Sequence, residues 1–225
     1  MRLWAWIPRF GSVFAPITIL AGCAAPSVDS VPAPSARAIL VRPGRAGFVV
    51  AARADHSAGA DAMAREIADQ TGFGLVVIAR PARGDTAREL AEAYARAAIE
   101  AARGPVRFLV DLREGVGSAC AGPMRIATVG VNTELAARLR VLAELIRDAH
   151  LRVNPEIARL TVVVDTTDAV TVTTPNTRAG LLGVLRPERA LSIELPPCAR
   201  RDWREMYGAV LSAFVAEAAA LAAGR

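Results

Sequence analysis

The sequence predicts an α/β domain with three layers, in which a mostly parallel, mixed sheet carries helices on both faces. Short apolar runs rich in Val, Ile and Leu alternate along the chain with longer stretches of helical period. The apolar runs lack the polar alternation of a half-exposed strand, which is typical of strands buried on both faces. Such strand–helix alternation favours parallel pairing, because each helix returns the chain to the same edge of the sheet.

The first half of the domain contains a strand–helix–strand unit followed by a second helix. Strands are predicted over 47–52 and 75–79, and a helix over about 58–70 that ends at Thr71-Gly72. Thr86 and Glu89 have the spacing of a capping box and predict a helix to about residue 103.

The second half continues the alternation. The predicted strands cover residues 106–112, 124–129, 160–164 and 190–195, and a helix covers 134–149. Asp202 and Glu205 again have capping-box spacing and open a last helix to about residue 222. Residues 170–174 are a candidate antiparallel hairpin or edge strand.

The N-terminus is typical of a bacterial secretion signal, with arginines followed by an apolar run over 10–20. That run is shorter than the about 20 residues of a membrane span, and Gly11 and Pro16 interrupt it. The segment Leu20-Ala21-Gly22-Cys23 resembles the lipobox of bacterial lipoproteins, which implies cleavage after residue 22 and lipidation of Cys23. An ordinary cleaved signal with an incidental cysteine is the alternative. We therefore expect a protein that is lipid-anchored to a membrane of the cell envelope, on its periplasmic or extracellular face.

The predicted organisation is a signal peptide over 1–22, a flexible Pro/Ser/Ala tether over 23–38 and one domain over 39–225. All 27 basic residues are arginine, and the formal net charge is +5. The arginines alternate with acids, as in Arg88-Glu89 and Arg204-Glu205, instead of forming a basic stripe, so we expect no nucleic-acid partner.

Ligands of such folds bind beyond the carboxyl ends of the strands. The residues near or after the carboxyl ends of the predicted strands include four arginines, two cysteines, a histidine and a glutamate: Arg53, His56, Arg80, Arg113, Cys120, Glu194, Cys198 and Arg200. In an oxidising compartment Cys120 and Cys198 are a candidate disulfide, because both follow strands predicted to end at one edge; two separately buried thiols are the alternative.

Three segments resemble motifs of the N-formylglutamate amidohydrolase family, which is related to zinc carboxypeptidases. Ala79-Arg80-Pro81 stands where that family has Asn-Arg-Pro, Asp111-Leu112-Arg113-Glu114-Gly115 where it has Glu-x-His-Gly, and Ile193-Glu194-Leu195-Pro196 where it has Ile-Glu-Leu-Pro. The resemblance spans most of residues 45–220. It implies a phosphorylase/hydrolase-like fold, zinc-dependent hydrolysis and Glu194 as the catalytic base.

The zinc ligands of that family are missing from this sequence. Without gaps, the first histidine falls on Arg53, the acid on Ser57 and the second histidine on Arg113. Arginine stays protonated and cannot bind zinc. We therefore expect a catalytically inactive domain without a metal cofactor, which binds an anionic small molecule, acidic peptide or cell-wall fragment. The expected ligand-binding residues are Arg53, His56, Arg80, Arg113, Glu194 and Arg200.

Two alternatives remain open. A shifted gap places His56 in the first ligand position, which keeps a zinc-dependent amidohydrolase or peptidase acting on acidic N-acyl or peptide substrates, with Glu194 as base. A structural role in envelope assembly requires no pocket ligand. The sequence predicts neither the ligand nor the oligomeric state.

Overall fold

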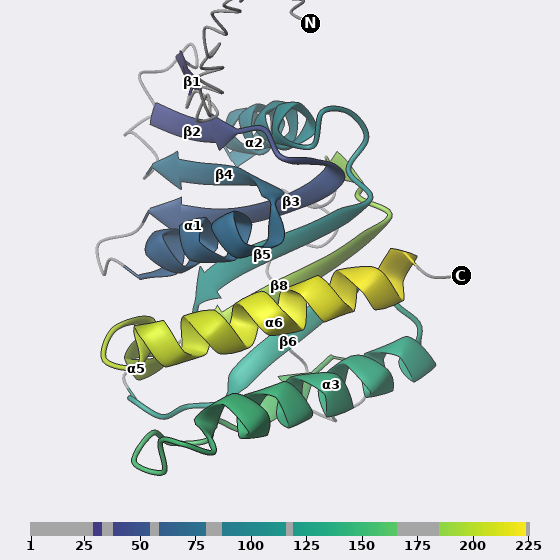
Figure 1. The fold of residues 1–225 in the computed structure, drawn as a ribbon. Coiled ribbons are helices and arrows are strands. Elements are labelled where there is room, and N and C mark those ends of the chain that lie inside the picture. The colour runs from purple at the N-terminus through teal and green to yellow at the C-terminus, as the bar shows by residue number, and fades with distance from the viewer. Residues whose placement is uncertain are drawn as a thin grey trace, which may run out of the picture.

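The computed structural model describes residues 29–32, 38–54, 59–79, 87–115, 119–165 and 185–223. Over these ranges the chain forms an eight-stranded mixed sheet of order β1-β2-β4-β3-β5-β8-β6-β7, with helices packed on it (Figure 1). This arrangement confirms the predicted three-layer α/β fold class. Cys23, His56, Arg80 and the candidate edge strand at 170–174 lie outside the described residues.

The strands are β1 Asp29–Pro32, β2 Ala38–Arg42, β3 Arg45–Ala54, β4 Phe73–Ala79, β5 Phe108–Glu114, β6 Met124–Val129, β7 Val162–Val164 and β8 Arg189–Leu195. The helices are α1 Ala60–Thr71, α2 Ala87–Ala101, α3 Thr133–Leu151, α5 Pro197–Arg200 and α6 Arg204–Ala223.

Strand direction changes on both sides of a parallel centre. β4, β3, β5 and β8 run parallel to one another. β6 is antiparallel to β8, and β7 follows β6 in parallel. The amino end of β6 therefore lies at the same edge of the sheet as the carboxyl ends of the four central strands.

The N-terminal side of the sheet differs from the sequence-based expectation. β2 pairs antiparallel with β4, and β1 pairs antiparallel with β2. Residues 29–32 were expected in the flexible tether but form this edge strand instead. Its proline and serine content hides it from pattern analysis, whereas an edge position tolerates Pro32 because one side of the strand needs no ladder bond.

Two apolar clusters lie on the two faces of the sheet. On one face α1, α3 and α6 cover the strands, with Met63, Leu139 and Phe214 in the shared core. On the other face α2 packs over the strands with Tyr94 and Ala98 (Figure 1). The helices therefore lie on both faces, as expected from the alternation of strands and helices.

The predicted and observed helix ends agree for α1 and differ for α6. α1 ends where expected, because Gly72 adopts a left-handed conformation and its N–H donates to the carbonyl of Ala68. The predicted capping box at the start of α6 is wrong in position. Trp203, not Asp202, precedes the helix and accepts from the N–H of Tyr207 at 2.9 Å.

Among the described residues, α6 alone is long and apolar enough to cross a membrane. Half of its most apolar window is buried inside the protein, where Val210, Leu211 and Phe214 are fully covered. This burial is typical of the core helix of a globular domain.

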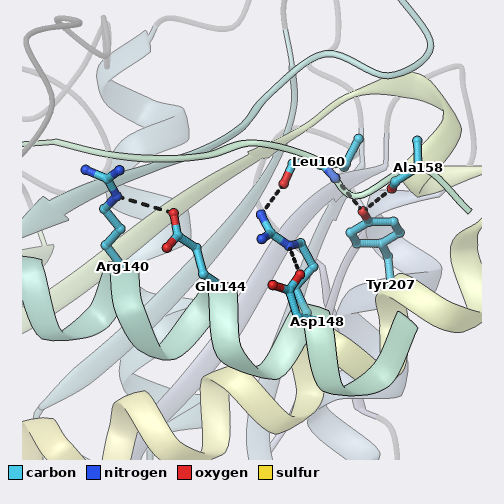
Figure 2. A network of polar contacts seen from close by, with 7 residues as sticks. Arg140, Glu144, Asp148, Ala158, Leu160 and Tyr207 are labelled. Atoms are coloured by element: carbon cyan, nitrogen blue, oxygen red, sulfur yellow. Dashed lines mark hydrogen bonds and ion pairs between the residues drawn. The ribbon is translucent and has the colours of Figure 1, made fainter. Parts of the chain in front are cut away.

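Tyr207 of α6 fixes the segment that leads into β7. Its hydroxyl accepts a hydrogen bond from the N–H of Leu160 at 3.0 Å and donates to the carbonyl of Ala158 at 2.7 Å (Figure 2). Arg147 of α3 donates to the carbonyl of Leu160 at 2.5 Å. Burial raises the pKa of Tyr207, and the hydrogen bond from Leu160 offsets part of that rise.

Tyr207→Phe should lower the free energy of unfolding by about 1–3 kcal/mol, because it leaves the buried N–H of Leu160 without an acceptor. Tyr94→Phe is the matched control. Tyr94 is equally buried, but its hydroxyl has no hydrogen-bond partner in the described part of the chain. Urea denaturation should show a loss for Tyr207→Phe and no loss for Tyr94→Phe; equal losses would contradict the assignment.

Candidate functional site

A row of charged residues crosses the carboxyl edge of the central strands on the face that α2 covers. Glu194 of β8 lies directly opposite Arg113 of β5 and, on its other side, directly opposite Arg125 of β6. Residues opposite each other in a ladder share a face of the sheet. The three side chains are therefore neighbours in the order Arg113, Glu194, Arg125.

Asp111 and Arg113 form a buried ion pair next to Glu194. The Nε of Arg113 lies 2.6 Å from Oδ2 of Asp111, and the side chains are 16% and 6% exposed, respectively. Burial alone would lower the pKa of Arg113, but the charge and hydrogen bond of Asp111 outweigh it, and the pKa is raised. The Arg113 guanidinium therefore stays charged inside the protein.

Arg53 and Tyr94 border the same cluster. Arg53 is the next-to-last residue of β3; it lies opposite Ile78, on the α2 face, and is half-buried. Burial, and after it the charge of Asp111, raises the pKa of Tyr94 well above its usual value, while Arg113 and Arg53 act in the opposite direction. Tyr94 therefore remains a neutral hydroxyl that can donate a hydrogen bond.

A cavity of about 230 Å³ opens beside Glu194 and Arg125. The other described residues that line it are Gly115, Ala119, Gly122, Pro123, Pro196 and Pro197. Glu194 is 8% exposed, and the Nε of Arg125 is buried without a hydrogen-bond partner among the residues that the structure describes. Within this part of the chain, the cavity has one carboxylate and one guanidinium on walls that are otherwise glycine, alanine and proline.

The structure brings together part of the residue set that the sequence analysis selected. Arg53, Arg113 and Glu194 share one face and one edge of the sheet. Arg200 lies apart from them: it donates to the carbonyl of Leu195 at 3.1 Å and pairs with Glu114 at 2.9 Å. Glu114 alternates with Arg113 along β5, so this pair lies toward the opposite face.

Arg125 was missed by sequence analysis. The sequence predicted a mostly parallel, mixed sheet and gave no direction for the strand over 124–129. The antiparallel direction of β6 brings Arg125, near its amino end, beside Glu194. The signal was one charged residue inside an apolar run, Met124-Arg125-Ile126, whose neighbours are both fully buried.

A disulfide joins Cys120 and Cys198, whose Cα atoms are 4.9 Å apart. It connects the loop after β5 to α5, and the N–H of Cys198 also donates to the carbonyl of Cys120 at 3.3 Å. Ala119 and Pro197, next to the two cysteines, line the cavity. The disulfide therefore holds two walls of the cavity together.

The described residues do not fit a zinc ion. Their one group of three close metal-ligand side chains is Cys120, Cys198 and Asp202, and both sulfurs are used in the disulfide. Glu194 has an arginine on each side, and a guanidinium cannot coordinate a metal.

No protein-family model and no curated protein matches the chain. Solved structures with a similar fold include the following three. Bacteriophage poly-γ-glutamate hydrolase has 13% sequence identity and a TM-score of 0.52, and the match covers 84% of this chain and 91% of that one. YNDL in a zinc-free form has 10% identity and a TM-score of 0.45, with 81% and 91% covered. A predicted metallopeptidase from Shewanella amazonensis has 11% identity and a TM-score of 0.41, with 79% and 80% covered. The first of these similarities shows a hydrolase-like fold, and at this identity it shows the fold alone.

Proposed function

We propose that this chain is a lipid-anchored protein of the bacterial cell envelope whose hydrolase-like domain binds an anionic ligand without metal-dependent hydrolysis. The observation that carries the proposal is Arg125, whose side chain lines the cavity and whose buried Nε has no partner in the described part of the chain. A buried charged group that lacks an acceptor is costly, and an anionic ligand in the cavity would stabilise the Arg125 guanidinium.

The charged residues in the row at the carboxyl edge of the sheet also favour binding of an anion. In the described part of the row, Arg53, Arg113 and Arg125 share a face with two carboxylates, Asp111 and Glu194, so these five residues carry one positive charge in excess. A ligand carboxylate at Arg125 would neutralise that excess. Poly-γ-glutamate, the substrate named for the bacteriophage hydrolase, is itself acidic. The ligand class that these charges favour is therefore an acidic small molecule, peptide or cell-wall fragment.

The loss of catalysis is inferred from Arg113. It occupies the position where the family resemblance expects a histidine ligand, and its raised pKa keeps it protonated. Glu194, which the resemblance implies as the catalytic base, has an arginine on each side, and a guanidinium cannot hold the metal that would activate a water.

Arg125→Gln should weaken binding of glutarate to the full-length protein by about tenfold or more, because it removes a charge-assisted hydrogen bond. Titration calorimetry measures the affinity. Arg88→Gln is the control, since Arg88 is highly exposed on α2 and pairs only with Glu92 among the described residues. Unchanged binding in Arg125→Gln, or equal losses in both variants, would refute this binding site.

The purified protein incubated with Zn²⁺ and N-formylglutamate should release no formate. Stoichiometric zinc that is lost in His56→Ala, together with formate release, would establish the amidohydrolase alternative instead. Absence of glutarate binding, with no change in envelope phenotype on Arg113→Ala, would favour the structural assembly role.

Lipid attachment has its own test. Cells that express the protein should incorporate a labelled fatty acid into it, and Cys23→Ala should abolish the label. Label that persists in Cys23→Ala would show that the anchor is wrongly assigned.

A further inference from the structure

We propose that the ligand of this cavity carries an ammonium group beside its carboxylate, so that the site recognises the amino-acid end of a zwitterionic or acidic molecule. Glu194 would accept from the ammonium, and Arg125 would donate to the carboxylate. This inference rests on the proposed function and specifies the ligand of the same site.

The inference is supported by two opposite charges that lie side by side without forming an ion pair. Glu194 and Arg125 are direct neighbours in the antiparallel ladder of β8 and β6. Side chains in that position lie about 4.5–5.5 Å apart at Cβ and pair readily. The described hydrogen bonds and ion pairs nevertheless include none between them, and the Nε of Arg125 stays unpartnered. Both side chains line the cavity instead.

Arg113 leaves Glu194 available to a ligand. The Nε of Arg113 is held by Asp111 at 2.6 Å, and Arg113 and Glu194 influence each other through their charges. Glu194 is 92% buried, since 8% of it is exposed. A buried carboxylate is stabilised by donors in direct contact, and charge at a distance replaces them only in part.

The other residues that line the cavity limit which chemical groups of a ligand the site can bind. The other described residues that line it are glycine, alanine and proline, which bring no charged side chain. Among the described residues, recognition by side chains therefore depends on one acceptor, Glu194, and one guanidinium, Arg125. An ammonium offers three donors to the first, and a carboxylate offers two acceptor oxygens to the second. An α-amino acid carries both groups on one carbon, which suits two protein groups on adjacent strands.

Glutamate and glutarate are matched probes, because they share the carbon chain and both carboxylates and differ only in the ammonium. Glutamate should bind the full-length protein about tenfold or more tightly than glutarate, as a charge-assisted hydrogen bond to Glu194 predicts. Glu194→Gln should remove this preference and leave glutarate binding equal or tighter. Glu134→Gln, an exposed glutamate on α3 that pairs with Arg138, should retain the preference.

Each outcome separates the ammonium inference from the binding proposal. Equal affinities for glutamate and glutarate would overturn the inference and leave the anion site standing. Binding of neither probe would overturn both. A preference that persists in Glu194→Gln would overturn the role of Glu194. If Glu194→Gln does not fold, the wild-type protein still tests the ammonium inference. Its affinity for glutamate should fall as the pH rises above the pKa of the probe's amine, and its affinity for glutarate should fall less.

Discussion

Reduction of the Cys120–Cys198 disulfide should lower the free energy of unfolding by about 4 kcal/mol. The two cysteines are 78 positions apart, and the entropy of closing a loop of that length in the unfolded chain gives this magnitude. The bond also joins the loop after β5 to α5, so its loss releases two walls of the cavity. We expect weaker ligand binding together with the lower stability.

Urea denaturation of oxidised protein, reduced protein and Cys120→Ser measures the effect. Cys120 is exposed, whereas Cys198 is 2% exposed, so Cys120→Ser removes the bond without placing a hydroxyl in the core. Reduced protein and Cys120→Ser should unfold at the same urea concentration. Oxidised and reduced proteins that unfold alike would show that the bond contributes no stability.

Asp111→Ala should destabilise the protein by about 3 kcal/mol, because it leaves the Arg113 guanidinium buried without its partner. Asp111 is 4% exposed and sits between the core of β5 and the charged row. Its loss also increases the excess positive charge, which Arg53 and Arg125 then share with Arg113.

A double-mutant cycle tests whether the two side chains act as a pair. Asp111→Leu with Arg113→Met should be more stable than Asp111→Leu alone, since an apolar pair of similar size carries no uncompensated charge. Urea denaturation measures the free energy of unfolding of each variant. Strict additivity of the two single substitutions would contradict a direct interaction between Asp111 and Arg113.

Some of this site was readable from the sequence. Asp111 and Arg113 are two residues apart in a strand, so their sharing of a face follows from strand geometry. Arg113 was selected because it follows a predicted buried strand, and Glu194 because it lies near the end of another. The two strands, β5 and β8, prove to be adjacent. Arg200 was selected for the same reason, but α5 directs it to Glu114 and away from the row.

The sequence by itself determined the local features of this protein. Apolar runs predicted β3, β4, β5, β6, β7 and β8 to within a few residues, and Gly72 predicted the end of α1, because periodicity and glycine conformation act over short stretches of chain. Only the tertiary structure decided that β6 runs antiparallel and that residues 29–32 pair at the edge. Strand order and direction depend on backbone partners far apart in the chain, and local patterns carry no information about them. The position of Arg125 beside Glu194, on which the proposed ligand depends, is a consequence of that long-range choice.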